Sequence, residues 1–366
     1  MKYIKIILTS FLMAAIFLFS FGCSSEGAEG NEKNQQANIT TENNSSPVNA
    51  TNKIPRLELI VYSSPAKYSY DDFLHDLKFI EDNYSSQVQV LKLCDTPDGR
   101  AVYDIVLGDI NGDKQVLIFG AMHAREYITT QIVMRQLCES IDAVNGYGGT
   151  YRGISDAELL QGITIHFVPL NNPDGVSISQ FGLNGINNDS IRSQVASIGG
   201  DYEQWKANAC GVDLNRNFDA GWQEFGGSPY PAADRYKGTS PGSEPEAAAL
   251  IKLTQDYHIK RAISYHTVGA LIYWYYKQSG AVLDESRKFA NEISSVTGYP
   301  LDSDYTAVDA AGYKDWAVYK LGIPSITIET GAESGYYDNP VPQRFFNGIW
   351  ERNKDVVYAT AYDLKF

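Results

Sequence analysis

Cysteine and histidine are scarce in this chain of 366 residues, which contains four cysteines and five histidines. No two cysteines form a Cys-x-x-Cys pair, and only Cys94, Cys138 and Cys210 follow Cys23. These three residues allow at most one disulfide, so a disulfide-rich scaffold is excluded and a zinc site built from cysteines is disfavoured. Buried free thiols are the expected state of these residues.

Basic residues are also in the minority, because 30 Lys and Arg residues stand against 44 Asp and Glu residues, giving a net charge of −14. Nucleic-acid binding requires a basic face, so the composition argues against a nucleic-acid partner. Hydrophobic residues make up 43% of the chain and aromatic residues 12%, which is enough for a large core. With no internal repeat and no clear boundary after about residue 55, we expect one folded domain over residues 55–366.

The N-terminal segment differs from the rest, because residues 6–21 are almost wholly apolar and follow a positively charged start. This run is short for a membrane span, which needs about 20 residues, so it predicts an export signal over residues 1–23. Its end, Gly22-Cys23-Ser-Ser, resembles a bacterial lipoprotein signal and predicts a lipid anchor at Cys23, the only expected membrane contact. The exported protein is then a cell-surface lipoprotein, with plain secretion as the alternative. Residues 24–54 are polar and predict a flexible linker.

Apolar patterns and turn residues predict the elements of the folded part. We expect helices at 70–83, 129–143, 282–297, 315–321 and 350–363, and strands at 88–93, 101–107, 116–119, 162–170, 262–265, 272–276 and 325–328. A further helix opens at Ser243-Glu-Pro-Glu246, a capping-box signature. Strand pairs followed by strands that alternate with helices predict an α/β fold, with a mixed sheet covered by helices on both faces.

Three of the predicted strands end in residues suited to zinc chemistry. The first runs into His123-Ala-Arg-Glu126, the second ends at His266, and the third ends at Glu329. Ligand sites in open α/β sheets form beyond the carboxyl ends of the strands, so these residues are expected at one shared site. Two histidines and one carboxylate, with a fourth position left for water, make a catalytic zinc shell. The pattern predicts a zinc hydrolase with one Zn²⁺ per chain.

Each of these carboxylates also has a plainer interpretation. Glu126 alone could interact with a helix dipole, Asp213 could form an Asx-turn, and Glu329 could pair with an arginine. The zinc hypothesis gives them joint roles. Asp213 then holds the second ring N–H of a ligand histidine, and Glu329 takes a proton from the zinc-activated water before passing it to the leaving amine.

These motifs together resemble the zinc carboxypeptidase family over residues 55–366. His123-Ala-Arg-Glu126, Asn-Pro-Asp-Gly175, Asp213-Leu-Asn-Arg-Asn-Phe218, His266 and Glu329 occur in the order of the family. The resemblance implies a single α/β domain with a central mixed eight-stranded sheet, one zinc ion, and hydrolysis of the C-terminal peptide bond.

The resemblance also implies a role for each matching residue. The zinc ligands are His123, Glu126 and His266, the general base and acid is Glu329, and Asp213 is the partner of the first histidine. Four matches concern the substrate. Asn215 and Arg216 clamp its terminal carboxylate, Arg125 contacts it further from the cut, and Arg192 polarises the scissile carbonyl. The mobile loop tyrosine of the family matches Tyr305 or Tyr313.

Substrate preference depends on Lys314, which matches the floor of the leaving-residue pocket in pancreatic-type members. A buried ammonium without a partner is costly, so Lys314 predicts an anionic leaving residue, unless it points to solvent. Peptides ending in Glu or Asp would supply the anion, and so would the diaminopimelate of a murein peptide. Gly312-Tyr-Lys-Asp-Trp316 resembles the bacterial γ-D-glutamyl-diaminopimelate peptidase branch, whereas Arg216 favours carboxypeptidase action on a free carboxylate. A zinc deacylase and a non-catalytic binding lipoprotein are the remaining alternatives.

Overall fold

A computed structural model of the chain describes residues 53–302, 310–332 and 335–366. The predicted export signal, Cys23 and nearly all of the predicted linker lie outside these ranges, as does Tyr305. No helix in the described part of the chain is long and apolar enough to cross a membrane.

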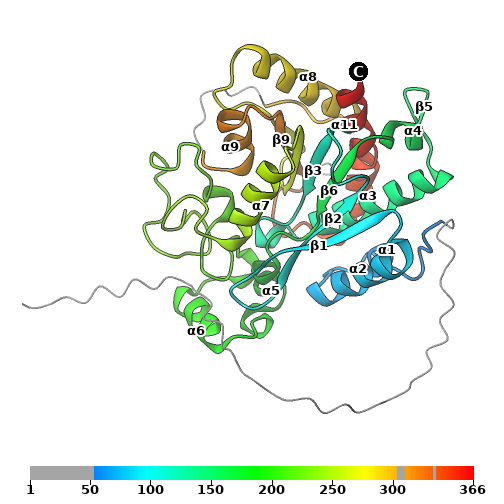
Figure 1. Cartoon of the computed structure of the whole chain (residues 1–366). Coiled ribbons are helices and arrows are strands. Elements are labelled where there is room, and N and C mark those ends of the chain that lie inside the picture. Colours follow the sequence, from blue (N-terminus) through cyan, green and yellow to red (C-terminus); the bar gives the residue numbers. More distant parts are fainter. Residues whose placement is uncertain (1–52, 303–309, 333–334) are drawn as a thin grey trace, which may run out of the picture. The chain divides into compact units, whose positions relative to one another are not determined.

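The described residues form one central sheet of seven strands (Figure 1). In sheet order the strands are β1 (Val88–Asp95), β2 (Ala101–Leu107), β6 (Thr164–Val168), β3 (Gln115–Phe119), β7 (Arg261–Thr267), β9 (Ser325–Thr330) and β8 (Leu271–Tyr273). The four strands β6, β3, β7 and β9 are parallel, and antiparallel strands flank them on both sides. The mixed α/β fold is therefore confirmed, but the sheet has seven strands here where the family resemblance implied eight.

Alternate residues of the central strands enter two different cores, as the two-residue period of a strand requires. In β3, Val116 and Ile118 belong to one apolar cluster, and Leu117 and Phe119 belong to the other. The first cluster includes residues of α2 (Tyr70–Tyr84), α3 (Ile128–Asp142), α8 (Gly280–Thr297), α10 (Phe346–Asn353) and α11 (Val356–Lys365). The second includes residues of α7 (Pro245–Asp256) and α9 (Tyr313–Lys320). Helices thus cover both faces, as predicted.

Two details of the predicted helices are wrong. The capping box at Ser243 does not form, because α7 begins at Pro245 and its N-cap residue Glu244 makes no side-chain cap hydrogen bond. The closing helix expected at 350–363 is instead two helices, α10 and α11, which are separated at Lys354 and Asp355.

Helices also form in a region where none was predicted. Asn172 caps α5 (Pro173–Phe181), accepting a hydrogen bond from the Gly175 N–H, and Pro173 occupies the first turn. A second helix, α6 (Asp189–Ile198), follows, and both helices pack on the buried ring of Trp205 in a third apolar cluster. The other short elements are α1 (Ile60–Ser63), α4 (Asp156–Leu160) and the ribbon of β4 (Thr150–Tyr151) and β5 (Ile154–Ser155).

Candidate active site

The proposed site lies where the parallel strands β3, β7 and β9 end at one edge of the sheet. His123 follows β3, whereas His266 and Glu329 lie within β7 and β9 and are directly paired in register. Ile263 and Ile328 enter the first apolar cluster, so His266 and Glu329, each at an odd spacing from them, project from the opposite face. The register of two parallel strands therefore places the second histidine beside the proposed base.

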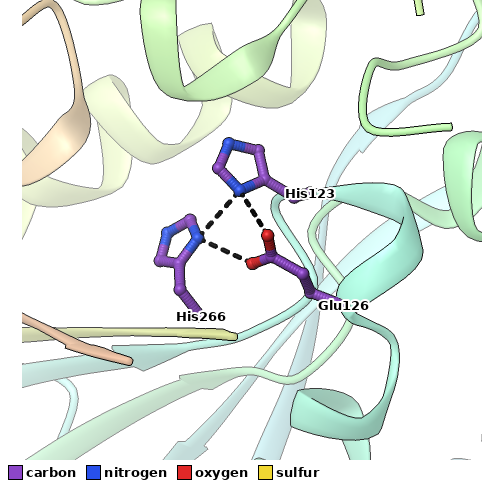
Figure 2. Close-up of side chains that lie close together, drawn as sticks. All are labelled: His123, Glu126 and His266. Atoms are coloured by element: carbon purple, nitrogen blue, oxygen red, sulfur yellow. Dashed lines mark hydrogen bonds and ion pairs between the residues drawn. The ribbon is translucent and has the colours of Figure 1, made fainter. Parts of the chain in front are cut away.

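Three predicted ligands converge at this edge (Figure 2). A short 3-10 turn over Ala124–Glu126 returns Glu126 to His123, so that Nδ1 of His123 lies 3.0 Å from Oε1 of Glu126. Nδ1 of His266 lies 2.9 Å from Oε2 of Glu126 and 3.0 Å from Nδ1 of His123. All three side chains are buried. Two imidazole nitrogens and a carboxylate facing one point are the donor set of a catalytic zinc site, so these residues fit the ion that the sequence predicts.

The partner of the first histidine is also in place. Nε2 of His123 lies 3.2 Å from Oδ1 of Asp213, which fixes the ring orientation and leaves Nδ1 toward the shared point. The same carboxylate accepts hydrogen bonds from the backbone N–H groups of Asn215 and Arg235, each at 3.2 Å. Asp213 therefore forms the Asx-turn and also serves as the partner of His123, two roles that the sequence left as alternatives.

The carboxylates of the site differ in pKa, because each lies in a different balance of burial and nearby charge. Burial alone would raise the pKa of Glu126, but His123 and His266 outweigh it and hold that pKa below its ordinary value. For Asp213, burial is likewise outweighed, by the charges of Lys206 and His123, and its pKa is well below the usual range. Burial raises the pKa of Glu329 to about 7, against the opposing attraction of His266. Glu329 thus differs from its neighbours by binding a proton readily near neutral pH, as a group that exchanges protons must.

Two cavities meet at this edge of the sheet. A cavity of about 300 Å³ is lined by Asn215, Arg216 and Lys314, together with several tyrosines. Another of about 410 Å³ is lined by Arg125 and Gln204. Four residues line both cavities: His123, Lys206, Tyr273 and Glu329. The first proposed ligand, His123, and the proposed base therefore lie at the junction, with space on either side for the two parts of a substrate.

Comparison with known proteins identifies the family. The profile of the zinc carboxypeptidase family matches residues 73–356. The chain belongs to the zinc carboxypeptidase family. Within it, the chain is 31% identical to gamma-D-glutamyl-L-diamino acid endopeptidase 1 of Lysinibacillus sphaericus over 84% of this chain and 75% of that protein. It is 25% identical to human carboxypeptidase A6, over 79% of this chain and 65% of that protein.

Two solved structures share the fold. Thrombin activatable fibrinolysis inhibitor superposes with a TM-score of 0.67 at 22% identity, over 86% of this chain and 79% of that chain. Carboxypeptidase A from Helicoverpa armigera superposes with a TM-score of 0.63 at 18% identity, over 81% of this chain and 73% of that chain. The mixed sheet flanked by helices is thus the architecture of the zinc carboxypeptidase family.

The predicted carboxylate clamp lies in the smaller cavity. Asn215 and Arg216 belong to a short 3-10 turn, and Oδ1 of Asn215 accepts a hydrogen bond of 3.1 Å from the backbone N–H of Tyr313. A Cβ on Gly312 would come within 2.7 Å of that oxygen, so any larger residue there would displace the Asn215 amide. The amide NH₂ of Asn215 is left as a donor. The Arg216 guanidinium lies 5.1 Å above the ring of Phe225, which holds the fork in place.

Lys314 lies in the same cavity, but its environment differs from the sequence prediction. Its ammonium donates to the carbonyl of Tyr275 at 2.9 Å and to Oδ1 of Asp315 at 2.5 Å, and only 12% of the side chain is exposed. It therefore neither points to solvent nor lacks a partner. The premise that an unpaired Lys314 awaits an anion is wrong, because the next residue on α9 supplies the counter-charge.

Three further predicted substrate residues have different outcomes. Arg125 lines the larger cavity and donates to the side chain of Gln204 at 3.2 Å, on the side expected for distant contacts. Arg192 lies on α6, where it pairs with Asp189 and donates to the carbonyl of Leu183, and it lines neither cavity. The intervening loop forms its own helix and holds this arginine there, so its expected contact with a scissile carbonyl is not supported.

The loop tyrosine remains a prediction for Tyr305, which lies outside the described residues. Tyr313 is unsuited to that role, because its side chain is fully buried. Its hydroxyl lies 2.8 Å from that of Thr254, and its ring packs edge-on against Phe119 and Phe218.

One residue that lines both cavities, Lys206, had no place in the sequence prediction. No motif marks it. The only local signal is its position between Trp205 and Ala207, two buried residues of the third apolar cluster, which turns the lysine away from that cluster.

Proposed function

We propose that this protein is a zinc-dependent metallocarboxypeptidase that hydrolyses the C-terminal peptide bond of its substrate. One observation carries this proposal: Asn215 and Arg216 share a cavity of about 300 Å³ with His123 and Glu329. A planar guanidinium matches a carboxylate bidentately, and a neutral amide adds a donor. A substrate held there by its terminal carboxylate would present its last peptide bond to the proposed base.

His123, Glu126 and His266 would hold the zinc ion. When bound, zinc supplies Lewis acidity, which lowers the pKa of water and polarises a carbonyl. Glu329 would accept the proton of the attacking water, because its pKa of about 7 suits both uptake and release. The same carboxyl would then donate that proton to the leaving amine, while Asp213 keeps the imidazole of His123 oriented.

A second candidate is a γ-D-glutamyl-diaminopimelate peptidase acting on murein peptides. It is supported by the 31% identity to the gamma-D-glutamyl-L-diamino acid endopeptidase of Lysinibacillus sphaericus. The paired charges of Lys314 and Asp315 in the leaving-residue cavity add to it, because they could bind a polar side chain carrying both signs of charge. Diaminopimelate has such a side chain.

A substrate panel on the purified full-length chain separates these candidates. The panel contains hippuryl peptides ending in Phe, Lys and Glu, a murein tetrapeptide, and an N-acyl amino acid that tests the deacylase alternative. Hydrolysis of hippuryl peptides that is lost with a chelator and restored by zinc would support the carboxypeptidase. Cleavage of the murein peptide alone would favour the second candidate. A chain without zinc and without turnover would leave only the non-catalytic binding protein and exclude both enzymes.

The cellular location is a further part of the proposal. We propose export, with a lipid anchor at Cys23 as the only membrane contact, and plain secretion as the alternative. The apolar run before Gly22-Cys23 supports this assignment. Mass spectrometry of the mature N-terminus tests it, because an N-terminus downstream of Cys23 would exclude lipidation.

A further inference from the structure

The wall of the larger cavity contains a closed ring of hydrogen bonds that passes through a proposed zinc ligand. Five residues form this ring, and all of them line the cavity: Arg125, Glu126, Gln204, Thr267 and Asn339. They come from the turn after β3, the segment after α6, the end of β7 and the segment after β9. A change at one point of the ring can therefore affect the position of the ligand carboxylate.

Glu126 is held in this ring by the backbone of Thr267. Oε1 of Glu126 faces Nδ1 of His123, and Oε2 faces Nδ1 of His266 (Figure 2). The N–H of Thr267, the residue after His266, donates to the same Oε2 at 3.2 Å. Unlike the two histidines, this donor would not be a metal ligand, so its effect is to restrict rotation of the carboxylate. Carboxylate ligands of metal sites are commonly held by hydrogen bonds of this kind.

Asn339 fixes Thr267 by two hydrogen bonds. Its side-chain NH₂ donates to the carbonyl of Thr267 at 3.1 Å, and its Oδ1 accepts the hydroxyl of Thr267 at 2.5 Å. Because a carbonyl can only accept, the orientation of the amide is determined, and the hydroxyl must be the donor. The two bonds restrain the main chain and the side chain of Thr267 together, so they also hold the direction of its N–H toward Glu126.

Apolar packing holds the segment of Asn339 against the end of β7. Val341 is buried in the first apolar cluster, and Val268 packs against that cluster. Gly331 lies beside both valines at a φ of +94°, where a Cβ would come within 2.8 Å of Val341 and 3.4 Å of Val268. Glycine therefore allows the segment after β9 to approach β7 closely. The residues that neighbour Asn339 and Thr267 thus fix the main chain on both sides of their contact.

The ring closes through Gln204 and Arg125. The side-chain NH₂ of Gln204 donates to the carbonyl of Asn339 at 2.5 Å, and its Oε1 accepts from the Arg125 guanidinium at 3.2 Å. Arg125 precedes Glu126 in the same 3-10 turn. Gln204 is exposed, whereas Thr267 is buried and Asn339 is half-buried. The bonds between Asn339 and Thr267 are therefore better shielded from water, and they form the part of the ring that should matter most for Glu126.

We propose that Asn339 is a positioning residue for the zinc ligand Glu126 and acts through Thr267. This inference rests on the proposed function, because it concerns the affinity and the geometry of the zinc site. Asn339 fixes Thr267, and the N–H of Thr267 orients Oε2 of Glu126 before a metal ion binds. A ligand that is oriented in advance loses less conformational freedom on binding. Removal of the Asn339 side chain should therefore weaken zinc binding and alter the coordination geometry.

The test compares the full-length wild type with variants of this contact. Asn339→Ala removes both bonds to Thr267, Thr267→Val removes the hydroxyl bond at nearly constant shape, and Thr267→Ser retains it. Asn83→Ala is the matched control, because Asn83 is also half-buried and donates to a carbonyl, that of Phe79 at 2.8 Å, but lines neither cavity. Three quantities are measured: the Kd for Zn²⁺ by competition with a chelator, the visible spectrum with Co²⁺ in place of Zn²⁺, and denaturant unfolding of the metal-free protein.

We expect Asn339→Ala to weaken Zn²⁺ binding by about 10-fold, the lower end of the usual effect of losing such a partner, and to shift the Co²⁺ absorption bands. Thr267→Val should weaken binding by a smaller factor, and Thr267→Ser should stay close to wild type. The double variant Asn339→Ala/Thr267→Val should match Asn339→Ala, because the bond lost in Thr267→Val is already absent there. Unfolding of the metal-free protein should change no more than in Asn83→Ala.

Unchanged Zn²⁺ affinity and an unchanged Co²⁺ spectrum in Asn339→Ala would overturn the proposal, and so would additive losses in the double variant. Equal losses in Thr267→Ser and Thr267→Val would also overturn it, and this pair decides the matter if Asn339→Ala does not fold. Hydrolysis enters none of these measurements. A wild type that binds zinc but cleaves no peptide would refute the proposed function alone, whereas a wild type that binds no metal would refute both.

Discussion

The active site combines two regions that are built in different ways. His266 and Glu329 belong to adjacent parallel strands and are paired in register, and His123 follows a third strand of the same set. Asn215, Arg216 and Lys206 lie instead on the irregular segment between α6 and α7, held by turns, caps and backbone contacts. The strand-borne groups would carry the proposed chemistry, and the proposed clamp residues Asn215 and Arg216 would bind the substrate. Rigid elements thus hold the groups that tolerate the least displacement.

The largest effect should come from removing a strand-borne ligand. His123→Ala should lose bound zinc and all measurable turnover, because two donors cannot replace a shell of three. Metal analysis of the dialysed protein measures the first effect, and an assay of the same sample measures the second. Full zinc occupancy in this variant would mean that the strand ends do not form the metal site.

The proposed base should behave differently from the ligands. Glu329→Gln should lower kcat by about 10²–10⁴, the usual contribution of general acid–base catalysis, while zinc stays bound. Loss of zinc in this variant would show that ligand and base have been exchanged in our assignment.

The pH profile of the wild type offers a separate check on Glu329. The ionised carboxylate is the base, so activity should fall as the pH drops through its pKa. Burial raises that pKa to about 7, and a bound divalent cation would draw it lower. The acid limb of kcat/KM should therefore lie at or below pH 7, and it should disappear in Glu329→Gln. An acid limb that persists unchanged in the variant would assign it to another group.

The proposed clamp residues of the loop-borne segment should show smaller effects, which appear mainly in KM. Arg216→Ala should raise KM by about 10- to 100-fold, because a hydrogen bond to a charged group contributes about 1.5–3 kcal/mol. Arg216→Lys keeps the charge but loses the planar fork, and should recover only part of the loss. Arg192→Ala is a useful comparison, since Arg192 lines neither cavity and pairs with Asp189. Equal losses in the Arg192 and Arg216 variants would contradict our separation of the two arginines.

The smallest expected effect concerns the support of the loop-borne segment. Glu246 of α7 is fully buried beside Asn208, and burial followed by the charge of Glu244 raises its pKa well above 4.5. The folded state therefore binds the proton more tightly than the unfolded state, and this contribution to stability is complete below pH 4.5 and lost as the pH rises through the folded pKa. Glu246→Gln should remove this pH-dependent loss of stability, so the variant should be more stable than wild type at neutral pH and about equally stable at pH 4. Denaturant unfolding at the two pH values measures this, and a variant that is less stable at both would refute the assignment.

The same contrast explains which parts of the site could be predicted from the sequence. Apolar runs ending in His266 and Glu329 are local patterns, and parallel strands necessarily bring their carboxyl ends to one edge, so these residues could be placed without coordinates. Arg192 is the only arginine between Gly175 and Arg216, but the loop that contains it forms its own helix, α6, and the sequence predicts no helix there. Lys206 reaches the site through backbone hydrogen bonds to Ala124 and Ala233, which leave no trace in residue type.

The fold shows a similar division. Elements with a clear period, such as α2 and β2, were placed within one or two residues of their observed ends. The sequence does not predict helix α5, although Asn172 and Pro173 supply its cap and its first-turn proline, because these residues directly follow an apolar strand. The cap expected at Ser243 does not form, because its hydroxyl accepts a hydrogen bond from the Asn217 side chain and donates one to the carboxylate of the neighbouring Glu244.

The alternation of β9 has a consequence for how such an enzyme can change over time. Its even-numbered and odd-numbered positions point to opposite faces of the sheet. Ile326 and Ile328 pack in the apolar core, and Glu329 lines the cavity. Inserting or deleting one residue before Glu329 would move each side chain of β9 to the opposite face, so that the Glu329 carboxylate would enter the apolar core. Length variation in this strand would therefore misplace the proposed base, whereas insertions in exposed surface loops are tolerated more readily.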